Sequence, residues 1–262
     1  MNETEPIIED VSKSTETYIL KNDKTYVALF GIIIIGSIVG IITFGLDLRL
    51  CAIPIMLCAF GYQQVQAKIK REFTKQFGAS IGFDYAETST MESVNGKLFQ
   101  TGHSQSLFDV LSGTQDNLPM RIFSFRFTIG YGKNSHTYSY TVFEVTLNNP
   151  VPNILLFSNE QTTAVSDWFS GDETVQLEGD FNKYFKLRVP KGREQEAYQI
   201  FTPDVMADLI DRARDFSFEF SGNHLYIYAP KVITKRDELQ NMFNLVTYMD
   251  NLFRKNASSV VI

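Results

Sequence analysis

Residues 118–147 read LPMRIFSFRFTIGYGKNSHTYSYTVFEVTL. Apolar and polar side chains alternate from Leu118 to Gly130, which is the pattern of a β-strand with two different faces. The turn cluster at 130–135 and the apolar residues that return at 136–147 predict an antiparallel hairpin. The apolar set changes face near Val142, and a β-bulge there would reconcile the two halves of the second strand. One face of the first strand is expected to carry Phe123, Phe125, Phe127 and Ile129.

The sequence beyond this hairpin predicts further strands and two helices. Thr202 and Pro203 are typical of the first positions of a helix, predicted over 204–213. A last helix, predicted over 235–255, has an apolar stripe that would cover a sheet. The predicted fold class is therefore α+β, an antiparallel β-sheet cytoplasmic domain with packing helices. Strands are also predicted at 153–157, 184–189, 216–220 and 224–229, and a short helix is possible near 88–94. The apolar stripe of the last helix consists of Leu239, Met242, Phe243, Val246, Met249 and Phe253.

The N-terminal part of the chain is apolar enough to enter a membrane. Tyr26 to Leu46, YVALFGIIIIGSIVGIITFGL, is twenty-one residues without a charge, and roughly 20 apolar residues cross a bilayer. A second apolar run, Leu50–Tyr62, follows after a short turn and predicts a transmembrane helical hairpin, whose second helix continues through 63–78. The first run is too long for a signal peptide, and an acidic segment precedes it. The predicted domains are an acidic N-terminal tail at 1–25, a two-helix transmembrane hairpin at 26–66 and a cytoplasmic α+β domain at 67–262, either as one domain or as two subdomains at 67–160 and 174–262.

Glycines indicate how the two spans pack against each other, and basic residues indicate on which side of the membrane their ends lie. Gly36 and Gly40 form a GxxxG pattern in the first span, which lets another backbone approach closely, from the second span or from a second copy. Arg49 is the one basic residue in the turn, whereas basic residues gather outside the spans. We therefore expect a multi-pass protein of the cell (plasma) membrane with both termini in the cytoplasm. The flanking basic residues are Lys13, Lys21, Lys24, Lys68, Lys70, Arg71 and Lys75.

Composition and spacing argue against several classes of function. The net charge of −6 leaves no basic excess for a polyanion, so no nucleic-acid partner is expected. Both cysteines, Cys51 and Cys58, lie in the second apolar run, so the cytoplasmic domain has no disulfide framework and no cysteine zinc site. The turn at 130–135 departs from a Walker A loop, with Phe127 where glycine is needed and Asn134 where serine or threonine is needed. We expect no cofactor and no metal.

A half-exposed aromatic surface is the candidate partner contact. Tyr138 and Tyr140 lie on one face of the returning strand, next to Tyr131 in the turn. Lys133 would matter only if the turn meets a partner or an anionic ligand. Exposed aromatic patches of this kind mark interaction sites. The alternative is that the final helix covers the patch.

Three motifs cover the chain from the hairpin to the last strands: GYGKNSHTYSYTV at 130–142, LRVPKGREQEAYQIFTPDVMADL at 187–209 and GNHLYIY at 222–228. In order and content they resemble a prokaryotic family of uncharacterised membrane-anchored proteins, in which a domain of unknown function follows two N-terminal transmembrane helices. The resemblance extends over most of 98–255. It implies a hairpin anchor and a folded domain, and it implies no activity.

These observations favour an interaction protein over an enzyme. We expect a membrane-anchored cytoplasmic interaction or scaffold module, an accessory subunit of a membrane complex, with the lipid bilayer and a protein partner or a second copy as its partners. The catalytic residues, if there are any, are unknown. The alternative is a membrane-associated hydrolase with a dispersed site, which would need a pocket that gathers His103, His136 or His224 with carboxylates. A transporter is disfavoured because the spans contain no charge.

Overall fold

The computed structural model describes residues 7–22, 31–32, 35–36, 52–148, 150–159 and 173–257. The chain divides into two compact units. The first consists of Met1–Phe77 with Thr234–Asp237, and the second of Gly78–Ile233 with Glu238–Ile262. The second unit contains the predicted sheet.

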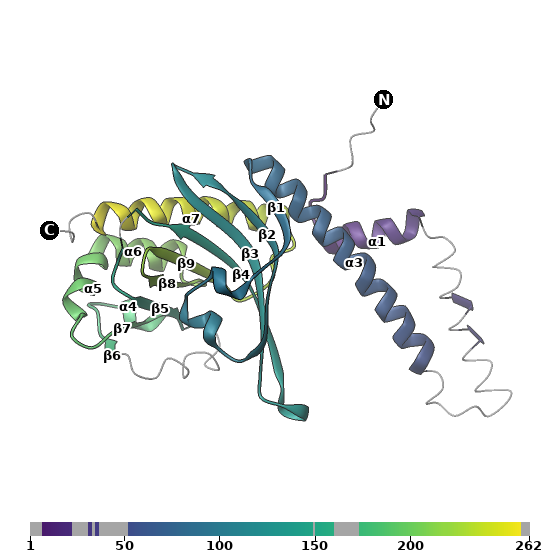
Figure 1. The fold of residues 1–262 in the computed structure, drawn as a ribbon, viewed down its shortest axis with the longest axis horizontal. Helices are drawn as coiled ribbons and strands as arrows, with labels where there is room; N and C mark the ends of the chain where they lie inside the picture. The colour runs from purple at the N-terminus through teal and green to yellow at the C-terminus, as the bar shows by residue number, and fades with distance from the viewer. Residues whose placement is uncertain are drawn as a thin grey trace. The chain divides into compact units, whose positions relative to one another are not determined.

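Within the described residues, nine strands form one sheet in the order β1-β2-β3-β4-β9-β8-β5-β7-β6, with antiparallel pairing throughout (Figure 1). The sheet takes strands from both 67–160 and 174–262. The α+β class with a large antiparallel sheet is confirmed. The strands are β1 (Asp84–Ser89), β2 (His103–Gln115), β3 (Leu118–Ile129), β4 (His136–Thr146), β5 (Ile154–Ser158), β6 (Glu173–Val175), β7 (Phe185–Val189), β8 (Ser217–Ser221) and β9 (His224–Ala229).

The β3–β4 hairpin forms as its alternation predicts, but without the expected bulge. The pairing runs without interruption from Met120↔Val145 to Ile129↔His136, so the bulge near Val142 was wrong. Residues 140–145 of β4 are all buried, because the sheet is covered on both faces at this strand. A strand buried on both sides has no polar face, and its apolar residues then need not keep one phase. The register shifts lie in β2 instead, beside Ser104 and Asp109, which both have a φ of 54°.

One face of the sheet is covered by the segment between β1 and β2, here called the 91–100 cover. It contains the short helices η2 (Met91–Ser93) and η3 (Lys97–Gln100). Phe99 of this cover packs against Phe125 and Tyr226, with ring centroids 5.0 and 5.1 Å away. The result is an aromatic layer that includes the predicted phenylalanine face of β3. The sequence predicted a short helix near 88–94, where η2 lies, and did not predict the strand β1 before it.

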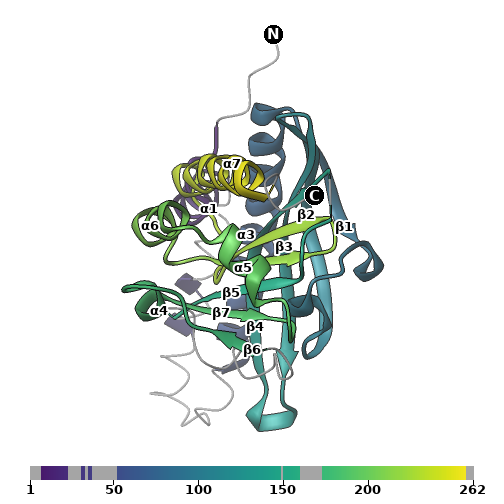
Figure 2. The same cartoon turned by 90° about the vertical axis from the view of Figure 1, so that its left-hand side faces the viewer.

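Helices cover the opposite face (Figure 2). The final helix α7 (Arg236–Ala257) buries all six residues of its predicted stripe. Its Phe253 contacts Phe218 and Phe220 of β8 through ring edges, 5.9 and 5.1 Å between centroids, so α7 covers the β8–β9 hairpin as expected. The other helices of this unit are α4 (Phe181–Tyr184), α5 (Glu194–Ile200) and α6 (Pro203–Arg212), the last with Thr202 and Pro203 at the predicted first positions.

In the first unit the structure describes two long helices, α1 (Val11–Asn22) and α3 (Ala52–Ile81). The predicted helical continuation through 63–78 is part of α3. No helix among the described residues is both long enough and apolar enough to cross a membrane. The first predicted span, 26–46, lies almost wholly outside the described residues. The transmembrane hairpin therefore stays a prediction.

The turn of the β3–β4 hairpin provides a test of backbone geometry. Gly130 has a φ of +72°, and a Cβ there would lie 2.3 Å from the carbonyl oxygen of Asn134. Gly132 has a φ of +60° but open space around it. A side chain in the left-handed region costs about 1–2 kcal/mol, so Gly132→Ala should lower the free energy of unfolding by about this much, and Gly130→Ala by more. Thermal unfolding of the purified full chain would measure both, with Lys133→Ala as the neutral control. Equal midpoints for the two glycine variants would contradict the close approach.

Candidate functional site

The tip of the β3–β4 hairpin presents an exposed aromatic ring on a fixed support. The side chain of Tyr131 is 81% exposed, yet its ring lies flat on the imidazole of His103, with 4.6 Å between centroids and 7° between planes. His103 is held in turn, because one ring nitrogen lies 2.8 Å from the carbonyl oxygen of Gly130 and the other 3.0 Å from the hydroxyl of Ser104. The tip therefore holds the ring of Tyr131 in one orientation.

The other predicted contact residues divide between surface and core. Lys133 is exposed in the turn helix η4 (Gly132–Asn134). Tyr138 is half-buried and stacks on Phe127, with 5.6 Å between ring centroids. Tyr140 is only 5% exposed, and burial, followed by the neighbouring Tyr138, raises its pKa to about 12.

The expectation of a half-exposed patch was thus wrong for Tyr140. Its ring faces Phe127 and Tyr228 in the aromatic layer on the side of the 91–100 cover. The alternative, coverage by the final helix, named the wrong element, because α7 packs on the opposite face. What remains at the surface is Tyr131 with Lys133, supported by His103, whose contact with the tip no sequence pattern indicated.

The two glycines predicted to pack helices are not both described. Gly36 is exposed, and a Cβ built on it would meet nothing within 4 Å. Gly40 lies outside the described residues. The helix-packing role of this pair therefore stays a prediction.

Two carboxylates lie buried between the sheet and the 91–100 cover. Glu219 of β8 accepts hydrogen bonds from the backbone N–H of Lys97 at 2.5 Å and from the hydroxyl of Tyr228 at 2.6 Å. Burial raises the pKa of Glu219 above its ordinary value, and these hydrogen bonds only partly oppose the rise. Burial also raises the pKa of Tyr228 well above its usual range, and Glu219 adds to that rise. The cover is therefore fixed to the sheet by a hydrogen bond to a buried carboxylate.

Glu144 of β4 is the second buried carboxylate. It forms an ion pair with Arg121, whose guanidinium also donates to the hydroxyl and the backbone carbonyl of Ser93 in the cover, at 3.1 and 2.8 Å. Nδ1 of His224 lies 2.9 Å from Oε1 of Glu144 but outside hydrogen-bonding geometry, so their attraction is electrostatic and requires a protonated imidazole. The hydroxyl of Tyr226 donates to Asn95 at 2.8 Å. Of the three histidines in the sequence, His224 thus lies beside a carboxylate, that of Glu144.

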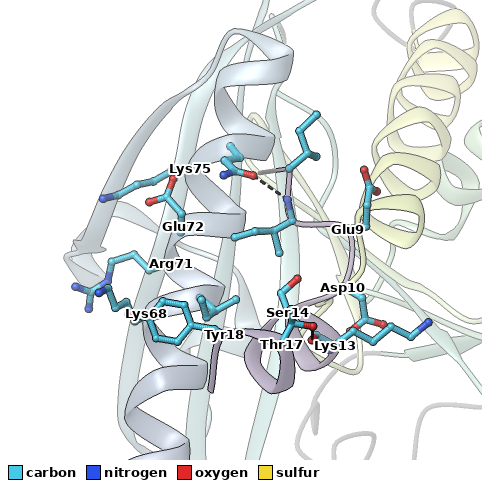
Figure 3. Close-up of a pocket in the computed structure, with 14 residues that line it drawn as sticks. Glu9, Asp10, Lys13, Ser14, Thr17, Tyr18, Lys68, Arg71, Glu72 and Lys75 are labelled. Atoms are coloured by element: carbon cyan, nitrogen blue, oxygen red, sulfur yellow. Dashed lines mark hydrogen bonds between the residues drawn. The ribbon is translucent and has the colours of Figure 1, made fainter. Parts of the chain in front are cut away.

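A groove lies between α1 and α3 in the first unit, here called the α1–α3 groove (Figure 3). Its volume is about 770 Å³. Apolar groups in its walls come from Ile7, Ile69 and the ring of Tyr18, and four basic side chains stand around them. The basic residues are Lys13, Lys68, Arg71 and Lys75, and the acidic residues of the lining are Glu9, Asp10 and Glu72.

Two smaller hollows lie in the second unit, and neither they nor the α1–α3 groove is lined by a histidine. The smaller one, about 180 Å³, touches Asn95 and Glu219 at the edge of the 91–100 cover. Among the described residues, no group of three or more His, Cys, Asp or Glu side chains is placed to hold a metal ion.

Comparison with known proteins identifies a likeness of fold. No family model matches the chain, and no curated protein matches it. A solved structure that is similar is the crystal structure of the mycobacterial trehalose monomycolate transport factor A, TtfA, with a TM-score of 0.51 and 14% sequence identity. The match covers 70% of this chain and 94% of TtfA. At this identity the likeness concerns the fold alone, and the resemblance to a membrane-anchored family stays a prediction.

The buried Glu219 predicts a pH dependence of stability. Its raised pKa means that the folded state keeps the proton at a pH where the unfolded chain has lost it. The free energy of unfolding should therefore fall as pH rises from the ordinary glutamate pKa through the folded-state pKa, and this loss should be complete above it. Glu219→Gln cannot titrate, so its unfolding midpoint should vary less with pH than that of the wild type.

Unfolding midpoints of the full chain between about pH 4 and 8, a range that begins near the ordinary glutamate pKa, would measure this. Glu92→Gln is the matched control, since Glu92 lies in the same cover with an exposed side chain. Parallel curves for Glu219→Gln and wild type would show that Glu219 does not carry the pH dependence.

Proposed function

We propose that this protein is a membrane-anchored cytoplasmic interaction module and an accessory subunit of a membrane complex, which contacts its protein partner through the β3–β4 tip. The observation that carries the proposal is the ring of Tyr131, 81% exposed and stacked flat on His103. Tyrosine is enriched among the residues that dominate protein–protein binding energy. A ring already held in one orientation also loses less entropy on binding.

The position of the tip supports this role. In Figures 1 and 2 the β3–β4 hairpin, drawn in teal, extends beyond the neighbouring strands and ends in its turn. Its base is fixed by the ring contacts of Phe127 with Phe125 and Tyr138, with centroids 5.2 and 5.6 Å apart. Lys133 adds one positive charge beside Tyr131. A partner with an apolar pocket and an acidic rim fits this surface.

The anchor is proposed from the uncharged run at 26–46 and the shorter run at 50–62. With Arg49 alone in the turn and basic residues outside the spans, both termini would face the cytoplasm and the chain would be a multi-pass protein of the plasma membrane. The partners in this proposal are the bilayer and a protein, either different or a second copy. TtfA, whose fold is similar, is a trehalose monomycolate transport factor, and an accessory role for the present protein is compatible with that likeness.

A membrane-associated hydrolase is the second candidate, and the His224–Glu144 pair is the observation in its favour. A carboxylate that accepts a hydrogen bond from a neutral imidazole can orient it as a general base, and the observed geometry places the two groups close together without forming that bond. The hydrolase would also need a substrate pocket beside this imidazole. The three hollows described above lie elsewhere, and the interaction module therefore comes first.

Photo-crosslinking in cells tests the contact at the tip. A photoreactive phenylalanine analogue at position 131 should give one adduct of defined mass, because the side chain would lie within the partner interface. The same analogue at Tyr198, which is 51% exposed in α5, is the matched control and should give several-fold less adduct. Replacing His103 by alanine should weaken the adduct from position 131. Equal or absent adducts at both positions would remove the tip as the contact.

Thiol labelling in intact cells tests the anchor and its orientation. In a chain with Cys51 and Cys58 replaced by alanine, Thr4→Cys and Ser258→Cys should react with a membrane-impermeant maleimide only after the cells are permeabilised. Arg49→Cys is the control and should react in intact cells, since the turn would lie on the far side. Labelling of Thr4→Cys or Ser258→Cys in intact cells would overturn the assigned topology.

A further inference from the structure

The α1–α3 groove is built by specific contacts and not by loose approach of two helices. Oδ1 of Asp10 accepts hydrogen bonds from the N–H groups of Ser12 and Lys13, at 2.8 and 3.2 Å, which caps the start of α1. The N–H of Ile8 donates to Oε1 of Gln76 on α3 at 3.0 Å. These bonds fix the residues before α1 against α3, so the groove has defined walls.

The two ends of the groove differ in charge. Lys68 and Arg71 of α3 lie beside the ring of Tyr18, as Figure 3 shows, and the ammonium of Lys68 is 5.7 Å from that ring's centroid. At the other side stand Glu9, Asp10 and Lys13, and the carboxylate of Asp10 is engaged in capping α1. Lys75 and Glu72 stand on the side of Arg71, so the basic residues are in excess at that end. A ligand with one anionic group and one apolar part would place the anion at the Lys68–Arg71 end.

The apolar part of such a ligand can lie on the apolar wall of the α1–α3 groove. Ile7 is 69% exposed and lines the groove together with Ile69 and Tyr18. A volume of about 770 Å³ falls within the range of about 300–1,000 Å³ that is usual for small-molecule sites. This combination of a cationic end and an apolar wall suits an amphiphile better than a free inorganic anion.

The sequence places this groove next to the proposed membrane anchor. α1 ends at Asn22, shortly before the apolar run that begins at Tyr26, and α3 begins inside the second run. Lys68 follows Tyr62, the last residue of that run, by six positions in α3, which at 1.5 Å per residue is about 9 Å along the helix. The head-group layer is about 5–8 Å thick on each side of the hydrocarbon. In the proposed anchor Lys68 therefore lies at the outer edge of the head-group layer, and Arg71 lies about one helical turn farther out.

We propose that the α1–α3 groove binds one anionic phospholipid from that bilayer. Its phosphate contacts Lys68 and Arg71 beside Tyr18, and its apolar part lies along Ile7 and Ile69. Arginine suits this role because its guanidinium can donate two parallel hydrogen bonds to a phosphate. The proposal rests on the membrane anchor of the proposed function and adds a lipid class to it. Charge complementarity and continuity with the bilayer favour a lipid over a partner helix.

Fluorescence quenching in reconstituted bilayers tests the site with the full chain. Trp168, the one tryptophan, is replaced by phenylalanine and Tyr18 by tryptophan, so that the groove carries the single reporter. The bilayers are phosphatidylcholine with a minor fraction of phosphatidylglycerol, and bromine is placed on the acyl chains of one lipid at a time. Brominated phosphatidylglycerol should quench the reporter several-fold more, per lipid present, than brominated phosphatidylcholine.

Charge variants provide the matched control. Lys68→Gln with Arg71→Gln should abolish the preference for phosphatidylglycerol, whereas Lys186→Gln with Lys191→Gln, an equal loss of charge in the second unit, should leave it unchanged. Circular dichroism would confirm that both double variants fold.

Equal quenching by the two lipids, or loss of the preference in both double variants, would overturn the groove as an anionic-lipid site. Absence of quenching by either lipid in a chain that floats with the bilayer would overturn it too, and the anchor would stand. A chain that does not float with the bilayer would instead contradict the proposed function itself.

Discussion

The second unit depends on how two carboxylates are kept inside a sheet that is covered on both faces. Glu144 and Glu219 point to the side of the 91–100 cover from β4 and β8, where water is excluded. An unpaired buried carboxylate would be costly, so the cover must bring partners to them. It does so with Ser93, whose contacts hold Arg121 against Glu144, and with the backbone N–H of Lys97, which donates to Glu219. The cover and the sheet are thus mutually required, and displacing the cover would leave both carboxylates without these contacts.

This arrangement explains which parts of the fold could be read from the sequence. The β3–β4 and β8–β9 hairpins and α7 have local periodicities that depend on burial alone, and all three were predictable. The 91–100 cover has no such periodicity, because its place is set by contacts with residues more than 100 positions away, such as Lys97 with Glu219 and Asn95 with Tyr226. The supposed bulge in β4 came from assuming that one face of that strand meets water.

In the candidate sites, too, features set by the local sequence could be predicted and features set by distant contacts could not. An exposed Tyr131 could be predicted, since a glycine-rich turn keeps its side chains at the surface. Its support by His103 could not, because that contact follows from the register of β2 with β3, which the two register shifts in β2 alter. The basic residues at 68–75 were visible as a cluster of charge. The groove they line was not, because α1 lies in what the sequence presented only as an acidic tail.

The aromatic layer joins residues of β3 and β4 with residues of β9, which come much later in the chain, and this separation affects folding during synthesis. Phe125 and Tyr140 leave the ribosome with β3 and β4, but their partner strand β9 begins at His224, 78 residues after β4 ends at Thr146. At about 5–20 residues per second, the ribosome needs roughly 4–16 s to make that stretch. For that time the edge of β4 that later pairs with β9 has no partner strand. The nascent chain therefore passes through a period in which β4 is an open sheet edge, and an open edge is a place where another chain can pair.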